Sequence, residues 1–200
     1  MYNALEKARQ VYVLKSYPTD DVTFDMTFKI QNAEVASKDG WETNANLANN
    51  VDYDGAPDVH ALDLWHWEFK AVHAYQTISN LPDGVYTLTA MARTNGADMC
   101  YVYAESGGVE YKEVVVGGGD TGNPWGLVSV PNILVSNGSP MEIGLKGKID
   151  NTWFSVDNFT LTLLRELTDD EKLDAAKKNL KSTIDAVDAL NTTKNIGEGV

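Results

Sequence analysis

The chain has 200 residues, of which 43% are hydrophobic and 22% charged, and its formal net charge is −13 at pH 7. This composition indicates a folded protein with material for one domain and its appendages. The basic residues between positions 21 and 164 are few and form no stripe that could neutralise phosphates. Nucleic acids and anionic membranes are therefore excluded as expected partners.

The single cysteine and the lack of long apolar runs exclude further kinds of protein. Cys100 is the only cysteine, so the chain has no internal disulfide and no zinc site built on cysteines. Its neighbours Met99 and Tyr101 predict an inert thiol in a buried strand. No run of about 18 apolar residues is present, so we expect no insertion into a membrane.

The first twenty residues carry a helical pattern. Leu5, Ala8 and Tyr12 recur at spacings of three and four residues, and Pro18 stops a helix soon afterwards. We therefore expect a short amphipathic helix and linker over residues 1–20. Because Met1 already lies inside this pattern, we also expect the chain to be a piece of a longer protein.

From Thr23 onward the hydrophobic period is that of β-strands. In one run, a single face is formed by Tyr86, Leu88, Ala90 and Ala92. Turn sequences such as Asp-Gly and Asn-Gly separate runs of this kind. The candidate strands are residues 23–30, 62–70, 74–79, 85–93, 99–105, 111–116, 126–130, 141–146 and 153–164.

No helical pattern lies between these strands, and this predicts how they pair. Parallel neighbours need long crossovers, usually helices, so we expect an antiparallel β-sandwich over residues 21–165. In the last strand, Phe154 and Val156 share one phase, whereas Phe159 and Leu161 share the other. A β-bulge at Asp157-Asn158 would bring both pairs to the same face.

The last segment, residues 166–200, is predicted to be helical. Thr168 and Glu171 have the spacing of a capping box. The apolar residues that follow form one stripe: Leu173, Ala176, Leu180, Ile184, Val187 and Leu190. A lone amphipathic helix needs a partner surface, so we expect it to pack on the N-terminal helix or to begin a following helical module.

Three stretches of the sandwich region carry a family resemblance: DMTFKIQNAEVASKDGWE, WEFKAVHAYQTISNLPDGVYTLTAMAR and WFSVDNFTLTLL. They resemble the galactose-binding-like jelly-roll modules of secreted, multi-domain proteins of Bacteroidetes, a superfamily that includes many carbohydrate-binding modules. The resemblance implies an all-β fold, an antiparallel jelly-roll β-sandwich, here with short flanking α-helices at both termini.

The resemblance also implies a function. Such a module is not catalytic and works outside the cell or at its surface, beside neighbouring domains of the same parent chain. It binds a polysaccharide or oligosaccharide through loops at one rim or through a concave sheet face, and it often holds a structural calcium ion.

The loops supply the residue types that sugar recognition requires. An aromatic ring stacks on the apolar face of a pyranose, and amide, carboxylate or guanidinium groups bind its hydroxyls. Trp125 either stacks on a ligand or tethers its own loop. Trp41 is expected chiefly to pack, because the family has a packing aromatic there. The ligand-binding candidates are Trp125, Asp120 and Asn123 in a glycine-rich stretch, Arg93 and Asn95 at a strand end, and Trp41 after a turn.

The family resemblance places a calcium site between the first and last strands of the sandwich. Calcium takes several oxygen ligands. Asp157 is the best candidate, with Asn32 or Glu34 opposite, and the expected bulge would present Asp157 and free a backbone carbonyl. The alternative is an aspartate that is bonded only to the local backbone.

No catalytic motif has the required spacing. The three histidines do not match a zinc motif, and no GxSxG sequence or Ser, His, Asp set is present. We therefore predict a carbohydrate-binding module that is not an enzyme. The alternative is a structural spacer or protein-interaction sandwich with no glycan ligand. A glycosidase would require two carboxylates that line a cleft.

Overall fold

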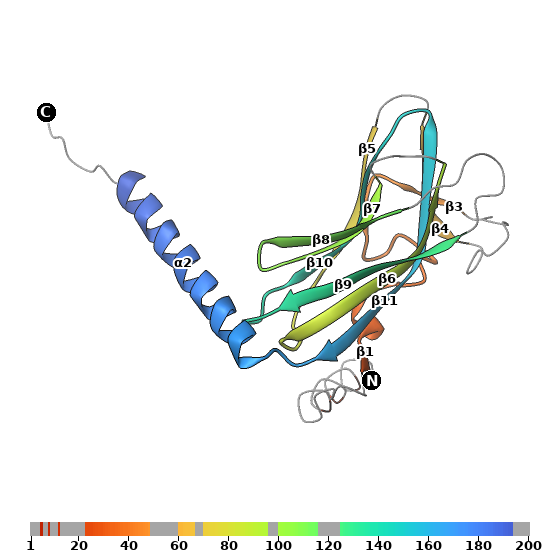
Figure 1. Ribbon diagram of the computed structural model, residues 1–200. Coiled ribbons are helices and arrows are strands. Elements are labelled where there is room, and N and C mark those ends of the chain that lie inside the picture. The colour runs from red at the N-terminus through yellow and green to blue at the C-terminus, as the bar shows by residue number, and fades with distance from the viewer. Residues whose placement is uncertain are drawn as a thin grey trace, which may run out of the picture. The chain divides into compact units, whose positions relative to one another are not determined.

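The computed structural model describes residues 23–48, 60–66, 70–95, 100–115 and 125–193, together with Leu5, Ala8 and Tyr12. The chain divides into two compact units, Met1–Glu166 and Leu167–Val200. In the described part of the first unit, the strands form two sheets whose pairings are all antiparallel (Figure 1). The predicted antiparallel β-sandwich is confirmed.

The two sheets are here called sheet A and sheet B, and along the chain the strands of each are interspersed with strands of the other. Sheet A has the order β3-β4-β11-β6-β9, with β1 paired to β11, and consists of β1 (Phe24–Asp25), β3 (Asn46–Ala48), β4 (Ala61–His66), β6 (Gly84–Thr94), β9 (Gly126–Val135) and β11 (Thr152–Arg165). Sheet B has the order β2-β5-β10-β7-β8 and consists of β2 (Glu42–Thr43), β5 (Lys70–Ile78), β10 (Met141–Ile149), β7 (Tyr101–Ser106) and β8 (Val109–Val114).

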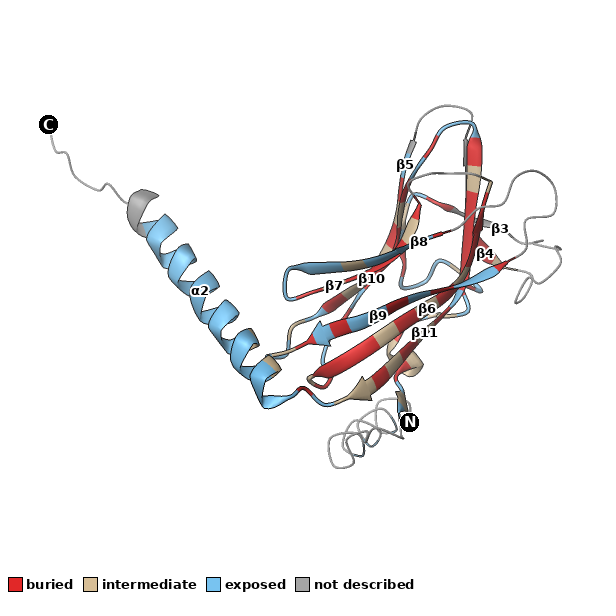
Figure 2. Cartoon of the chain, in the orientation of Figure 1, coloured by how far each residue is buried: buried red, intermediate tan, exposed pale blue. Residues whose placement is uncertain are grey.

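One hydrophobic core joins the inner faces of the two sheets. Leu88 and Val156 of sheet A belong to the same buried cluster as Val102 and Leu145 of sheet B. Burial alternates along the strands, as Figure 2 shows, because successive side chains of a strand point to opposite faces. The predicted inward face of β6 is confirmed, since all four of its apolar residues are buried: Tyr86, Leu88, Ala90 and Ala92.

The predicted bulge in the last strand is also confirmed. The register between β11 and β6 shifts between Asp157 and Thr160, and Asn158 has a φ of 52°. The extra residue lets Val156 and Phe159 both point into the core, where each is fully buried. It leaves Asp157 on the outer phase of β11.

The first predicted strand, residues 23–30, is wrong beyond its start. β1 ends at Asp25, and a 3₁₀-helix, η1 (Thr27–Lys29), follows it. The Oδ1 atom of Asp25 accepts a hydrogen bond from the N–H of Thr27 at 2.8 Å. A local side-chain bond of this kind competes with strand pairing, and the resulting turn buries Met26 and Ile30.

Strand β9 runs five residues further than the predicted 126–130, to Val135. Pro131 lies inside this strand, although proline cannot donate to a sheet ladder. In the described residues β9 lies at the edge of sheet A and pairs only with β6. An edge strand tolerates proline, and the register shift between Tyr86 and Leu88 takes up the irregularity.

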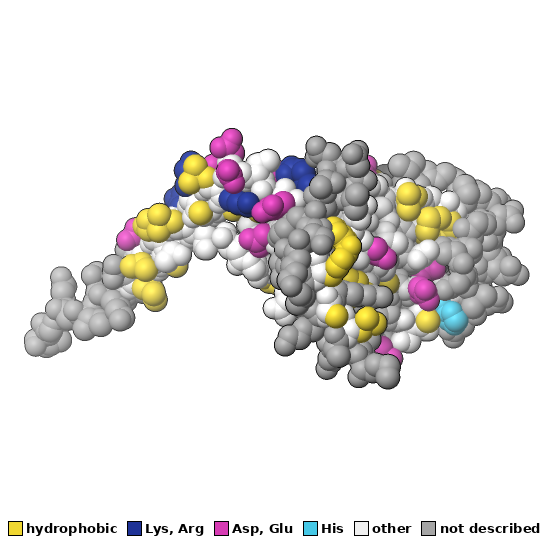
Figure 3. All heavy atoms as spheres, turned by 90° about the horizontal axis from the view of Figure 1, so that it is seen from below, with side chains coloured by type: hydrophobic (Ala, Val, Ile, Leu, Met, Phe, Trp, Pro, Cys, Tyr) yellow, Lys and Arg dark blue, Asp and Glu magenta, His cyan; other side chains and the backbone are white. Residues whose placement is uncertain are grey.

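The second unit contains helix α2 (Asp169–Thr193). Its predicted capping box is confirmed, because the Thr168 N–H donates to Glu171 Oε2 at 2.8 Å and the Glu171 N–H donates to Thr168 Oγ1 at 3.2 Å. Figure 3 shows apolar side chains at its surface among charged ones. No helix among the described residues is both long and apolar enough to cross a membrane. The stripe members Leu173, Leu180, Ile184, Val187 and Leu190 are all exposed.

The predicted burial of the Cys100 thiol is confirmed, although Cys100 lies one residue before β7 and not in a strand. Cys100 is fully buried in the core, and burial raises its pKa to about 11. A thiol with that pKa is almost wholly protonated at neutral pH and is a poor nucleophile. Gly147 of β10 lies against it, because a Cβ added at Gly147 would overlap with Cys100 Sγ.

Gly147→Ala should therefore destabilise the sandwich. Overpacking of a filled core costs about 1–3 kcal/mol, and chemical denaturation followed by tryptophan fluorescence measures it. Gly126→Ala is the matched control, because its added Cβ would meet only the Ala92 carbonyl oxygen at an ordinary 3.8 Å. Equal free energies of unfolding for the two variants would contradict this packing.

Candidate functional site

The structure brings together two of the predicted ligand-binding residues, Arg93 and Trp125. The guanidinium carbon of Arg93 lies 4.7 Å from the ring centroid of Trp125 and 5.0 Å from that of Trp153. Arg93 and Trp125 are only 5% and 7% exposed, so the arrangement suits packing better than stacking on a ligand. The indole N–H of Trp125 has no acceptor among the described residues, and a ligand-binding role for this pair stays a prediction.

A half-buried carboxyl that the sequence analysis did not single out, that of Asp63, lies in the same row of sheet A. Ser155 of β11 pairs with Asp63 on one side and Arg93 on the other, and its hydroxyl donates to Asp63 Oδ1 at 2.6 Å. Burial raises the pKa of Asp63, against the lowering effects of the Ser155 hydrogen bond and the Arg93 charge. These polar groups link three neighbouring strands.

Asn95 joins this region through its backbone. Its N–H donates to the Trp153 carbonyl at 3.2 Å, and its carbonyl accepts a hydrogen bond from Thr152 Oγ1 at 2.7 Å. These bonds close the end of the β6–β11 pair. The two other candidates from the glycine-rich stretch, Asp120 and Asn123, lie outside the described residues.

Trp41 packs inside the sandwich. It is 6% exposed, and its ring lies 4.7 Å from that of Phe159 at an interplanar angle of 36°. Its indole N–H donates to the Asn32 carbonyl at 3.2 Å. This geometry matches the packing role that the sequence analysis preferred for Trp41, and it leaves little of the indole for a ligand.

The residues proposed for calcium fit that ion only in part. Asp157 is fully buried, and its Oδ1 accepts the Asn158 N–H at 2.6 Å. Asn32 has a φ of 52° and donates its side-chain amide to the Ser37 carbonyl, whereas Glu34 is exposed. Within the described ranges, no group of three or more His, Cys, Asp and Glu side chains could hold a metal ion. Calcium takes six to eight oxygens, so a site here would depend on backbone carbonyls.

A larger set of functional side chains covers the outer face of sheet B. The strand registers place the outward residues in three rows that cross the strands: Glu42–Tyr75–Gly144–Tyr103–Lys112, His73–Lys146–Tyr101–Val114 and Thr77–Glu142–Glu105–Glu110. We call the aromatic and charged members of these rows the tyrosine face: Glu42, His73, Tyr75, Tyr101, Tyr103, Glu105, Glu110, Lys112, Glu142 and Lys146.

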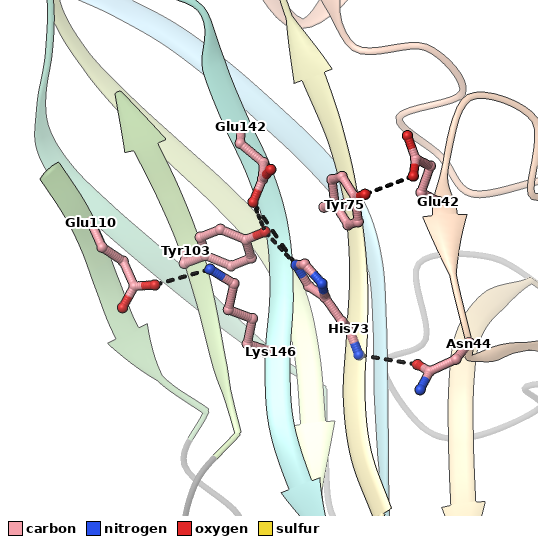
Figure 4. A network of polar contacts seen from close by, with 8 residues as sticks. All are labelled: Glu42, Asn44, His73, Tyr75, Tyr103, Glu110, Glu142 and Lys146. Atoms are coloured by element: carbon pink, nitrogen blue, oxygen red, sulfur yellow. Dashed lines mark hydrogen bonds and ion pairs between the residues drawn. The ribbon is translucent and has the colours of Figure 1, made fainter. Parts of the chain in front are cut away.

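Tyr103 is the centre of the tyrosine face, and its contacts are drawn in Figure 4. Its hydroxyl donates to Glu142 Oε1 at 2.5 Å and lies 2.8 Å from His73 Nε2. Because the hydroxyl proton goes to Glu142, the oxygen is left to accept from the Nε2–H of His73. The ammonium group of Lys146 lies 3.8 Å from the centroid of the Tyr103 ring, and Tyr103 is fully buried beneath its neighbours.

The aromatic groups that remain accessible lie around Tyr103. The His73 and Tyr75 rings are stacked, with centroids 4.4 Å apart and an interplanar angle of 19°. The Tyr75 hydroxyl donates to Glu42 Oε2 at 2.6 Å, and the His73 side chain is 41% exposed. Tyr101 is half-buried on the other side of Tyr103, at a centroid distance of 6.3 Å. Half-exposed rings are thus held at both sides of the central strand β10.

Two lysines of the tyrosine face are paired with one carboxylate. Glu110 accepts from Lys112 at 3.0 Å and from Lys146 at 3.1 Å. The ammonium group of Lys112 also lies 4.7 Å from the centroid of Tyr101. Exposed ion pairs contribute little to stability one by one. Together these contacts fix where the ammonium groups lie.

Titration of the tyrosine face reflects burial and this charge pattern. Burial lowers the pKa of His73, Lys146 lowers it further, and Glu142 and Glu42 oppose the shift. Burial also raises the pKa of Tyr103 far above its ordinary value, and the neighbouring carboxylates act in the same direction. At neutral pH the Tyr103 hydroxyl therefore keeps its proton and the imidazole of His73 is mostly neutral.

The sequence analysis missed the tyrosine face. Its aromatic residues alternate with core residues in two short runs, KAVHAYQTI and YVYAES. Two outward aromatics in each run were a usable signal, since aromatic rings on an open sheet face suit a ligand. Only the register shows that both pairs flank the same strand, and register between distant strands is not readable from periodicity.

The similarity between this chain and known proteins is a similarity of fold. No protein-family model and no curated protein matches this sequence. Among solved structures, TmCBM61 in complex with β-1,4-galactotriose is 18% identical, with a TM-score of 0.51 over 69% of this chain and 98% of its own. A cyclase from Fischerella sp. TAU is 14% identical, with a TM-score of 0.55 over 74% of this chain and 100% of its own.

Another solved structure, a family 16 carbohydrate-binding module, is 19% identical, with a TM-score of 0.45 over 66% of this chain and 98% of its own. The two structures with the higher TM-scores share the antiparallel β-sandwich with this chain at low identity. One of them holds an oligosaccharide and the other is an enzyme, so this fold hosts both binding and catalysis. Function must be argued from the site.

The charges around His73 predict how its titration responds to substitution. Lys146→Gln should raise the pKa of His73 and Glu142→Gln should lower it, because the first removes a like charge and the second removes an opposite one. NMR titration of the imidazole measures both shifts, with Lys29→Gln in η1 as the control, because Lys29 belongs to the same unit and is not among the charges that shift the pKa of His73. Shifts of the opposite sign would contradict the geometry.

The lowered pKa of His73 also predicts in which direction the free energy of unfolding changes with pH. Because the folded pKa of His73 lies below its ordinary value of about 6.5, the unfolded chain binds the proton more readily. The His73 contribution to stability is therefore fully present above about pH 6.5 and is lost as the pH falls through the folded pKa.

Proposed function

We propose that this protein is a non-catalytic carbohydrate-binding module that binds a glycan chain on the tyrosine face. The observation that carries the proposal is the clustering of half-exposed aromatic rings with carboxylates and ammonium groups on one open sheet face (Figure 4). Aromatic rings stack on the apolar faces of pyranoses, and the charged groups accept and donate hydrogen bonds to hydroxyls. Tyr75, His73 and Tyr101 supply the rings, and Glu142 and Glu42 supply acceptors.

The buried Tyr103 prepares this surface before a ligand arrives. It holds Glu142 through its hydroxyl and Lys146 over its ring, so these two side chains lose less freedom on binding. Side chains that are already immobilised lower the entropic cost of association. Glu142 remains 31% exposed, so its carboxylate stays within reach of a hydroxyl group.

Similarity of fold supports the proposal without deciding it. TmCBM61 has a similar β-sandwich, and its structure was solved in complex with β-1,4-galactotriose. The tyrosine face belongs to a sheet, which is one of the two locations that the family resemblance implies for a glycan. The proposal therefore rests on the chemistry of this face, and the fold makes it an ordinary use of the scaffold.

We further propose the setting in which the module works. It would be part of an extracellular or cell-surface bacterial protein that processes glycans, with residues 1–20 and 166–200 leading to neighbouring domains of the same chain. The exposed apolar stripe of α2 supports a partner domain, because apolar side chains repeated along one helix face are stable when covered.

The same stripe favours a second candidate function, a spacer or protein-interaction sandwich without a glycan ligand. In that case α2 would contact a neighbouring helical domain and the tyrosine face would bind no sugar. Binding of a glycan at the tyrosine face separates the two candidates, because a spacer has no use for that surface.

Tyr75→Ala tests the proposal directly. The substitution removes a half-exposed ring that stacks on His73, and we expect about a tenfold loss of affinity for the bound polysaccharide. Affinity electrophoresis against soluble galactan, xylan and β-glucan identifies the ligand, and calorimetry measures the change.

Thr87→Ala is the matched control for Tyr75→Ala, because Thr87 lies on a strand of the other sheet and is partly exposed. It should leave affinity unchanged. Loss of binding in Trp153→Phe together with unchanged binding in Tyr75→Ala would instead place the site beside Arg93, Trp125 and Trp153. No binding to any polysaccharide would favour the spacer.

We also propose a structural calcium ion at Asp157. Asp157 holds its carboxylate in a fully buried position, carboxylate oxygens are ligands of calcium, and the bulge turns the backbone of Asn158 beside it. If the ion is bound, chelation should lower the melting temperature by several degrees, since a ligand of the folded state stabilises it.

Asp157→Asn should remove the sensitivity of the melting temperature to the chelator. Glu34→Gln serves as a comparison, because Glu34 is exposed and would matter only if it is a ligand. A melting temperature that is the same with and without chelator in the unsubstituted protein would rule the ion out.

A further inference from the structure

The tyrosine face carries an uneven balance of charge. Its acidic members are Glu42, Glu105, Glu110 and Glu142, and its basic members are Lys112 and Lys146, with Lys148 in the next row along β10. Both basic members are paired with Glu110, at 3.0 Å and 3.1 Å. Their positive charge is therefore offset within the face itself.

The other three carboxylates keep their negative charge toward solvent. Glu42 and Glu142 accept hydrogen bonds from the hydroxyl groups of Tyr75 and Tyr103, and a neutral donor leaves the charge of a carboxylate in place. Glu105 lies between Glu142 and Glu110 in its row and has no ion-pair partner among the described residues. Glu142 also lies 3.9 Å from His73 Nε2, and the lowered pKa of His73 keeps that imidazole mostly neutral at neutral pH. At neutral pH a ligand on this face thus meets carboxylates that no cation among the described residues has neutralised.

The same carboxylates also affect the buried hydroxyl group of Tyr103. Burial, the hydrogen bond to Glu142 and then the charges of Glu142, Glu105 and Glu110 all raise the pKa of Tyr103. The three glutamates of one row therefore act on the centre of the site. They disfavour any additional negative charge placed there.

We infer that the tyrosine face selects neutral glycans and rejects polyanionic ones such as polyuronates, with Glu105 and Glu142 as the excluding groups. This inference rests on the proposed function and names the ligand class of the same site. A like charge placed against fixed carboxylates is a repulsive element, and specificity commonly depends on such elements as well as on attraction. Neutral pyranoses keep the stacking and hydroxyl contacts without this repulsion.

Paired measurements test the inference. The protein should bind at least one neutral polysaccharide among galactan, xylan and β-glucan, and it should bind polygalacturonate far more weakly at low salt. Glu105→Gln should strengthen polygalacturonate binding about fivefold, a larger change than it causes in the binding of a neutral glycan, because only the polyanion is repelled by the lost charge. Added salt should likewise narrow the gap, because it screens exposed charges.

Glu113→Gln is the control for the same loss of charge. Glu113 is exposed on β8 but pairs with Val102, so it belongs to the alternate phase of the strand and not to the tyrosine face. It should change neither affinity. Equal binding of polygalacturonate and neutral glycan at low salt, or equal effects of the two variants, would overturn the inference. Failure to bind any neutral glycan would instead refute the proposed function.

Discussion

The position of strand β10 at the centre of sheet B is the constraint on which the site depends. It pairs with β5 on one side and β7 on the other over most of its length. Its inward residues Met141, Ile143 and Leu145 are buried in the core, so the alternate residues are obliged to face outward. A slip of one residue would bury Glu142 and Lys146. The packing of the core therefore fixes the register that assembles the tyrosine face.

Once the strands of sheet B are in register, polar contacts determine how the side chains of the tyrosine face are arranged. Tyr103 lies on β7, yet its hydroxyl bonds to side chains from β10 and β5. Because each partner comes from a different strand, the network exists only when the sheet is formed. Its cost is the burial of a phenol on an outer face, and its two hydrogen bonds offset that cost. The arrangement still leaves His73 and Glu142 partly exposed.

Features that depend on neighbouring residues in the chain were predictable from the sequence. The inward face of β6, the bulge at Asp157 and the cap at Thr168 all follow from local spacing, and the structure contains each of them. The 3₁₀-turn after Asp25 was missed because one side-chain hydrogen bond overrode a strand-like pattern. The order of strands was not predictable, since it depends on contacts between distant parts of the chain.

The candidate site shows the same division. The predicted ligand-binding residues include two tryptophans, Trp41 and Trp125. Both are buried, because a large ring stabilises the fold most when it is removed from water. Tyr75 and Tyr101 lie partly exposed, because a phenol presents an apolar ring and a polar tip, which suits a position at the boundary with water. Residue type therefore indicated that aromatic recognition was available, and strand register decided which rings could provide it. In such sandwiches, the outward phase of paired strands therefore indicates a ligand site better than the size of an aromatic side chain does.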